Sequence, residues 1–206
     1  MSDPRQQHMT ALAAQITACG LCGGMNKPGE TEAAPGYGSV RSPVVIVGQS
    51  LCQQCMETQE PFTGGSGALL NDSLKIAGIA KKNAFITNVV HCHPPGNRKS
   101  RAHEKKNCCR YLHQELEIVR PRLVIGLGRD AEVALKAFYP DARELQWPFR
   151  VPHATGPEAA SSPDLLFAPH PSWIKRQHDD SIEEQYVTRL ARALEWGFRD
   201  RPRPGR

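Results

Sequence analysis

Residues 84–90 read Ala-Phe-Ile-Thr-Asn-Val-Val, an apolar run that is too short for a helix and rich in β-branched side chains. Three further runs share these properties and are followed by turn or polar residues: Val44 to Val47, Leu123 to Leu127 and Leu165 to Ala168. Such runs are typical of strands that are buried in a parallel sheet. The sequence therefore predicts four parallel strands.

Segments with helical spacing alternate with these runs. They are Met9 to Ala18, Gly67 to Ile79, His103 to Arg120, Asp130 to Phe138 and Ser181 to Trp196. This order predicts a three-layer α/β/α sandwich with a central four-stranded parallel sheet. Functional residues of such folds lie in the loops at the carboxyl ends of the strands. Those loops are Gly48 to Gly67, His91 to Ala102, Gly128 to Asp130 and His170 to Asp180, and Pro140 to Asp164 is expected to be irregular.

Length and composition place limits on the class of protein. The chain has 206 residues, of which 39% are hydrophobic, and we expect one domain over residues 1–198. No apolar run approaches the roughly 20 residues of a membrane helix. The N-terminus lacks the residue order of a secretory signal, so we expect a cytoplasmic protein in a reducing environment that does not favour disulfides.

Basic residues concentrate in two places, although the net charge is only +5. Between Asn97 and Arg110, six basic residues accompany one acid, Glu104, and residues 199–206 hold four arginines among prolines. We expect the second stretch to be a disordered basic tail. A charged, solvated surface and a phosphate-binding surface are both compatible with either cluster.

Seven cysteines in such a chain indicate a metal or redox role for some of them. Cys19 and Cys22 form a Cys-x-x-Cys pair, Cys92 follows the second strand, and Cys108 lies near the start of a helix. Four thiolates bind either zinc or an iron-sulfur cluster, and spacing alone does not choose between these. The alternative to a metal site is that Cys92 and Cys108 are ordinary buried thiols.

Several motifs resemble, in order, those of family 4 uracil-DNA glycosylases, the iron-sulfur branch of the uracil-DNA glycosylase superfamily. They are Gly48-Gln49, Pro61 to Gly67 (Pro-Phe-Thr-Gly-Gly-Ser-Gly), Ile86 to Arg98 (Ile-Thr-Asn-Val-Val-His-Cys-His-Pro-Pro-Gly-Asn-Arg), Leu127-Gly128 and His170-Pro171-Ser172. The likeness runs from about Cys19 to Arg176. It implies a 4Fe-4S cluster on Cys19, Cys22, Cys92 and Cys108, which we expect to be structural.

The resemblance also implies hydrolysis of the N-glycosidic bond of a deaminated base, uracil first, flipped out of DNA in base excision repair. Phe62 would stack on the base, Asn88 would read its polar edge, and His170 would stabilise the departing base. Arg98, Ser172, Trp173, Lys175 and Arg176 would contact DNA, with Trp173 and Ile174 as an apolar wedge. We expect a monomer that associates with the nucleoid through DNA.

The first active-site motif departs from the family's pattern. Gln49 occupies the position of the family's glutamate, and Cys55 occupies the position of a later acid. The two carboxylates to which the family's positioning or activation of water is assigned are thus replaced by an amide and a thiol. Gln49 can orient water or bind the base but takes no proton at neutral pH. Glu57 and Glu60 are nearby replacements. Cys52 and Cys55 form a second Cys-x-x-Cys pair. Packed thiols, a covalent role, and a second metal site completed by Cys109, His91 or His93 are the three interpretations of this pair.

Other interpretations remain open at this stage. The chain could be a lesion-binding protein without turnover, a glycosylase with a preference for hypoxanthine or xanthine, or a zinc-stabilised nucleotide-binding protein. Taken singly, Phe62 could be a core residue, Asn88 could satisfy backbone groups, and His170-Pro171-Ser172 could be a simple turn. Trp173 could pack against the last helix.

Overall fold

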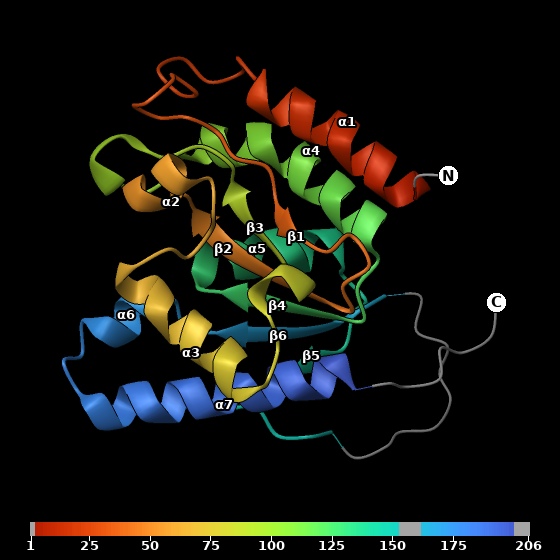
Figure 1. Cartoon of the computed structure of the whole chain (residues 1–206), viewed down its shortest axis with the longest axis vertical. Helices are drawn as coiled ribbons and strands as arrows, with labels where there is room; N and C mark the ends of the chain where they lie inside the picture. The colour runs from red at the N-terminus through yellow and green to blue at the C-terminus, as the bar shows by residue number, and fades with distance from the viewer. Residues whose placement is uncertain (1–2, 153–161, 200–206) are drawn as a thin grey trace.

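A computed structural model describes residues 3–152 and 162–199 of the chain, and its helices and strands alternate as predicted (Figure 1). The helices are α1 (Pro4–Thr17), α2 (Gln53–Thr58), α3 (Ala68–Ile76), α4 (Ala102–Val119), α5 (Arg129–Phe138), α6 (Pro171–Lys175) and α7 (Asp180–Phe198). The strands are β1 (Tyr37–Gly38), β2 (Val44–Ser50), β3 (Phe85–Val90), β4 (Leu123–Leu127), β5 (Glu144–Leu145) and β6 (Asp164–Ala168). Short 3₁₀ turns cover Gly65–Gly67, Lys81–Asn83 and Pro95–Asn97.

The strands form one sheet in the order β1-β3-β2-β4-β6-β5. Its four central strands are the four predicted ones, and they pair in parallel. The predicted four-stranded sheet is too small by two edge strands, because β1 adds to β3 antiparallel and β5 adds to β6 in parallel. Each of these edge strands has only two residues, which is too few to produce a recognisable apolar pattern.

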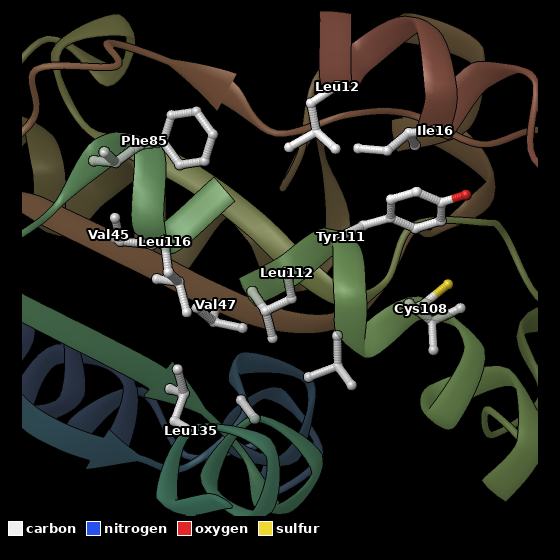
Figure 2. Close-up of a cluster of buried hydrophobic side chains, with 14 of the residues drawn as sticks. Leu12, Ile16, Val45, Val47, Phe85, Cys108, Tyr111, Leu112, Leu116 and Leu135 are labelled. Carbon is white, nitrogen blue, oxygen red and sulfur yellow. The ribbon is translucent and has the colours of Figure 1, made fainter. Parts of the chain in front are cut away.

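Alternate residues of β2 face opposite layers, which gives the predicted three-layer sandwich. Val45 and Val47 point into a core that α1, α4 and α5 cover, as Figure 2 shows. Val44 and Ile46 belong to a second core beneath α3 and α7. Both faces of the sheet are therefore buried, as parallel sheets require, and the carboxyl ends of the strands are free to carry a site.

Two short helices, α2 and α6, were not foreseen, because the sequence there predicted only loops after strands. Each has six residues or fewer and begins at a capping side chain, Cys52 for α2 and His170 for α6. A third helix, α3, ends three residues earlier than predicted. Gly78 adopts a left-handed conformation there (φ 68°), and Ile79 donates a hydrogen bond to Leu74 O, which closes the helix.

Some predictions fall on parts of the chain that the structure does not describe. The predicted basic tail lies outside the described residues from position 200 on, and the segment predicted to be irregular contains β5 and the undescribed residues 153–161. The single-domain boundaries stay a prediction. Within the described ranges, no helix combines the length and apolar character needed to cross a membrane.

The packing of α7 on the sheet depends on a glycine. A Cβ atom on Gly197 would lie 2.5 Å from Val44 Cγ2 and 2.9 Å from Leu123 Cδ2. We expect Gly197→Ala to lower the free energy of unfolding by about 1–2 kcal/mol, because overpacking outweighs the helix propensity of alanine. Urea denaturation measures this, with Glu184→Ala on the exposed side of α7 as the control. Equal or higher stability of the Gly197 variant would contradict the packing.

Candidate active site

The carboxyl ends of β2 and β3 bring two side chains together over a glycine. Gly48 and Asn88 are level with one another in the parallel pair. A Cβ atom on Gly48 would lie 2.5 Å from Asn88 Oδ1 and 2.9 Å from Phe62 Cζ. Because nothing larger than a hydrogen fits on this Cα atom, glycine allows the Asn88 amide and the Phe62 ring to approach the same point.

Phe62 is fixed by its main chain. It has a left-handed backbone (φ 55°), which is unusual for a bulky residue and marks a constrained position. Asn71 on α3 donates its side-chain amide to Phe62 O at 3.1 Å. A Cβ atom on Gly67 would lie 2.3 Å from the same oxygen. The segment that carries the aromatic ring is therefore held from the α3 side.

His170 follows β6 and caps α6. Ser172 donates its main-chain N–H to His170 Nδ1 at 3.2 Å, and Ser172 Oγ lies 2.8 Å from the same nitrogen. Burial, with a smaller effect of Arg176, lowers the pKa of the His170 imidazole from its usual 6.5. The ring is thus neutral at pH 7. Because Nδ1 accepts the Ser172 N–H, the single ring proton of the neutral His170 imidazole is on Nε2.

The position of His170 depends on two further contacts. Gly128 after β4 has φ 88°, and a Cβ atom on it would lie 3.0 Å from His170 Cβ. Tyr186 on α7 donates its hydroxyl to Pro169 O at 3.0 Å. These contacts explain why the Leu127-Gly128 motif and the His170 motif occur together at adjacent strand ends.

Phe62, Asn88 and His170 line one cavity of about 150 Å³. The other lining residues come from the loop after β2 and the turn before α3: Ser50, Leu51, Cys52, Gln54, Cys55, Pro61, Thr63, Gly64, Gly65, Ser66 and Gly67. A cavity of this volume accommodates a ring of benzene size. The volume of the cavity is therefore comparable to that of one six-membered ring.

Gln49 and the nearby acids are not part of this lining. Residues of β2 alternate between its faces, so Gln49 follows Gly48 on the opposite side of the strand. Glu60 pairs with Lys81 at 2.8 Å, and Glu57 accepts the Gln53 amide at 3.1 Å. Among the described residues, no carboxylate lines the cavity. The catalytic role of Gln49 stays a prediction.

The residues after His170 form a helix, where the sequence predicted a strand-opening loop. Trp173 is half exposed on it, whereas Ile174 is buried in the core beneath α7. The predicted apolar pair is therefore wrong for Ile174, because one side of this short helix faces the core. Lys175 pairs with Glu183, while Arg176 is exposed. The DNA contacts of Ser172, Trp173, Lys175 and Arg176 stay a prediction.

Arg98 has a structural partner in the same chain. Its guanidinium donates two hydrogen bonds to Glu104, whose carboxylate also accepts the main-chain N–H of Arg101 at the start of α4. The Arg98 bonds, followed by that main-chain bond, lower the pKa of Glu104 from 4.5 to about 2 against the effect of burial. Nearby, Lys105 pairs with Asp130. The DNA contact of Arg98 stays a prediction.

The four cysteines of the first set meet beside α4. Cys92 and Cys108 are buried, and Cys19 and Cys22 pack against the same core (Figure 2 shows Cys108). Burial raises the pKa of the Cys92 thiol to about 12, and Cys108, Cys19 and Cys22 add to this shift. Within residues 3–152 and 162–199, however, no three His, Cys, Asp or Glu side chains are arranged to hold a metal ion.

The second cysteine pair corrects an expectation. Cys52 and Cys55 form a disulfide at the start of α2, although the predicted reducing compartment led us to expect none. The reason is local, because Cys52 caps the helix and its sulfur accepts the main-chain N–H of Cys55 at 3.2 Å. In this state the pair is neither two packed thiols nor a metal site. Cys109 lies apart, with its sulfur 3.0 Å from Lys106 O.

A buried polar group next to the cysteines was missed by the sequence analysis. Glu115 on α4 contacts His91 Nε2 at 3.1 Å, accepts from Thr87, and accepts the Gly36 N–H at 2.7 Å. Although burial opposes it, the Glu115 carboxylate raises the pKa of His91 to about 10. The available signal was an acid on the apolar face of the predicted helix, flanked by buried Leu112 and Leu116.

The fold and the cavity define an α/β protein with a small aromatic and polar cavity at the carboxyl ends of its parallel strands. The family model described as the uracil DNA glycosylase superfamily matches residues 35–195. The chain therefore belongs to the uracil-DNA glycosylase superfamily.

Curated relatives support this assignment. A Type-4 uracil-DNA glycosylase of Pyrobaculum aerophilum is 40% identical over 103 residues, which is 50% of this chain and 53% of the relative. The Type-4 uracil-DNA glycosylase of Archaeoglobus fulgidus is 34% identical over 58% of this chain and 59% of the relative. The Type-4 uracil-DNA glycosylase of Thermotoga maritima is 29% identical over 68% of this chain and 70% of the relative. The similarity to the first two thus spans only about half of their length.

The Arg98–Glu104 pair makes stability depend on pH. We expect Glu104→Gln to lower the free energy of unfolding at pH 7 by about 2 kcal/mol, through loss of charged hydrogen bonds. The pKa of Glu104 is lower in the folded protein, so this stabilisation is present above pH 4.5 and is lost as the pH falls toward 2.

Urea denaturation at several pH values measures the difference between the native protein and the variant. Glu117→Gln, on the exposed side of the same helix, serves as the control and should change stability by less than about 0.5 kcal/mol. A difference between native and Glu104→Gln proteins that does not shrink in acid would show that the carboxylate charge is unimportant.

Proposed function

We propose that this protein is a DNA glycosylase of base excision repair that removes uracil by hydrolysing its N-glycosidic bond. The observation that carries the proposal is the single cavity that Phe62, Asn88 and His170 line together. Uracil in duplex DNA is reached only after the nucleotide is flipped out of the base stack. A cavity of about 150 Å³ suits one pyrimidine ring better than a two-ring purine.

Each of the three side chains has a defined task in this proposal. The Phe62 ring offers a face on which the base stacks. The Asn88 amide provides one donor group and one acceptor, which match the O4 and N3–H of uracil and mismatch the 4-amino group and N3 of cytosine. His170 presents its Nε2–H to uracil O2.

The proposed chemistry depends on the departing base. As the glycosidic bond breaks, negative charge develops on uracil, and a neutral imidazole N–H stabilises that charge without having to lose a proton. The sugar becomes oxocarbenium-like and is attacked by water. Since no carboxylate lines the cavity in the described part of the chain, water would be oriented by hydroxyl and amide groups such as Ser66 and Gln54.

The DNA partner is proposed to lie across the strand ends. Trp173, exposed on α6 beside His170, and the cationic side chains of Lys175 and Arg176 suit the edge of a flipping site. Arg101 and Lys106 on α4 are exposed in the basic segment and suit phosphate contacts. We further propose a monomer that works in the cytoplasm on chromosomal DNA.

We propose Cys19, Cys22, Cys92 and Cys108 as the ligands of a 4Fe-4S cluster. Burial, with a smaller effect of the neighbouring cysteines, raises the pKa of the Cys22 and Cys92 thiols. Metal binding would offset this cost, because coordinated thiols are deprotonated. A four-iron cluster also separates its thiolates more widely than a single ion does. The cluster would tie the turn after α1 to β3 and α4, and glycosidic hydrolysis needs no redox step from it.

A lesion-binding protein without turnover is the second candidate. The observation that favours it is the lack of a carboxylate among the described cavity residues, of which Cys55 occupies the position of an acid in the family's motif. Such a protein would bind uracil-containing DNA and release no free base.

An alkaline-cleavage assay on end-labelled DNA with one uracil, hypoxanthine or xanthine tests the proposal. We expect cleavage at uracil, a loss of about 10²–10³-fold in His170→Ala through lost charge stabilisation, and at least a hundredfold loss in Gly48→Ala through displacement of Phe62 and Asn88. The Glu184→Ala variant is the control. Binding without cleavage, or cleavage only in Gln49→Glu, would favour the lesion-binding protein instead.

Iron analysis of anaerobically purified protein tests the proposed cluster. We expect iron and acid-labile sulfide in equal amounts in the native protein and their loss in Cys108→Ala. Cys109→Ala alters the next residue of α4 and should keep both. Zinc in place of iron, or unchanged iron in Cys108→Ala, would contradict the proposed ligands.

A further inference from the structure

The disulfide of Cys52 and Cys55 lies in the wall of the cavity. Both residues are among those that line it, together with Phe62, Asn88 and His170. No family motif quoted above accounts for the pair, and glycosidic hydrolysis does not use it. A second observation concerns access, because Cys55 is buried (4% exposed), whereas Cys52 is partly exposed. Cys52 is thus the more exposed residue of the pair.

The helix that carries the disulfide packs outside the two large cores, where Met56 is buried and its sulfur accepts the Glu32 N–H at 3.2 Å. Leu51 and Cys55 form, with Ala34, a separate cluster of only three buried residues, against which Cys52 packs. This cluster belongs to neither of the two large cores. Small satellite clusters leave a segment free to open locally at low cost. A covalent link across the first turn of α2 therefore adds to the local order of this helix.

The order of α2 passes to Phe62 through the intervening chain. Gln59 ends the helix in a left-handed conformation (φ 54°), and Phe62 and Gly64 are also left-handed. Cys52 Sγ lies 4.0 Å from Thr63 O, and Gln54 fills the space next to Gly64. Strained residues persist only where their surroundings hold them. The main chain that carries Phe62 is thus contacted by α3 at Phe62 O and by the start of α2 at Thr63 and Gly64.

We propose that Cys52 and Cys55 are a reversible dithiol–disulfide site that controls the base cavity. In the disulfide form α2 is fixed and Phe62 is held for stacking. In the dithiol form the first turn of α2 loosens and base removal slows. The proposal rests on the proposed function for its effect on activity, but the redox chemistry of the pair does not depend on it.

Oxidation and reduction balance with common reactants. Hydrogen peroxide oxidises the pair: two S–H bonds and one O–O bond break, one S–S bond and two O–H bonds form, and two water molecules leave. A small dithiol reverses this. Its thiolate attacks the sulfur of Cys52, the more exposed residue, and expels Cys55 as the leaving thiolate. The second thiol of the reductant then resolves the mixed disulfide, and the reductant is itself oxidised.

The test uses the full-length protein, handled anaerobically in buffers with graded ratios of oxidised and reduced dithiothreitol, which spare an iron-sulfur cluster from peroxide. Alkylation followed by peptide mass spectrometry reports the thiol state of Cys52 and Cys55. Uracil release and fluorescence-detected binding of uracil-containing DNA are measured in the same buffers. The variants are Cys52→Ser/Cys55→Ser, which cannot form the bond, and Cys109→Ser as the matched control.

We expect the native protein and Cys109→Ser to lose on the order of tenfold in base release and DNA binding as the pair becomes reduced, which is the scale expected for opening so short a loop. The double variant should show the lower values in every buffer. A pair that does not change its alkylation, rates that ignore the thiol state, or a double variant with the native redox response would overturn the proposal. If no buffer permits base release, the proposed function fails, and the binding curve still decides the redox site.

Discussion

The close approach of three chain segments at Gly48 is the constraint on which the site depends. Its Cα atom is level with Asn88 in β3 and lies under the ring of Phe62, so both side chains converge where a Cβ atom would otherwise be. The parallel sheet sets the level of Gly48 and Asn88, and the left-handed backbone at Phe62 sets the ring. His170 completes the cavity from β6, where Gly128 leaves room for it. The chemistry therefore follows from steric fit at the strand ends.

The strongly shifted charged groups of this protein lie beside α4, whereas no carboxylate of the described residues lines the cavity. The charged side chains with strongly shifted pKa values, Glu104 and His91, are paired inside or beside α4. In the cavity, burial and the cation of Arg176 lower the pKa of His170 and favour its neutral form, which in the proposed reaction would donate a hydrogen bond to the base. A glycosylase that stabilises its leaving group in this way has less need of a carboxylate, which agrees with a cavity wall made of amides, hydroxyls and sulfur.

The sequence was sufficient for the central fold, because the four buried strands are continuous apolar runs and the long helices have regular spacing. It failed for β1, β5, α2 and α6, each of which is shorter than any periodic signal. Phe62, Asn88 and His170 were predicted together because each belongs to one of the ordered motifs, and the structure brings them to one cavity; their roles stay predictions. The exclusion of Gln49 from the cavity, the burial of Ile174 and the Cys52–Cys55 bond could not be foreseen, since each depends on which way one side chain faces.

A crystal structure with free uracil, the product of the proposed reaction, tests the central claim most directly. The account predicts a planar six-membered ring between Phe62 and Asn88, with the base edge on the Asn88 amide and O2 within hydrogen-bond distance of His170 Nε2. Uracil bound elsewhere, or an empty cavity at saturating uracil together with unchanged positions of Gly48 and Phe62, would contradict it.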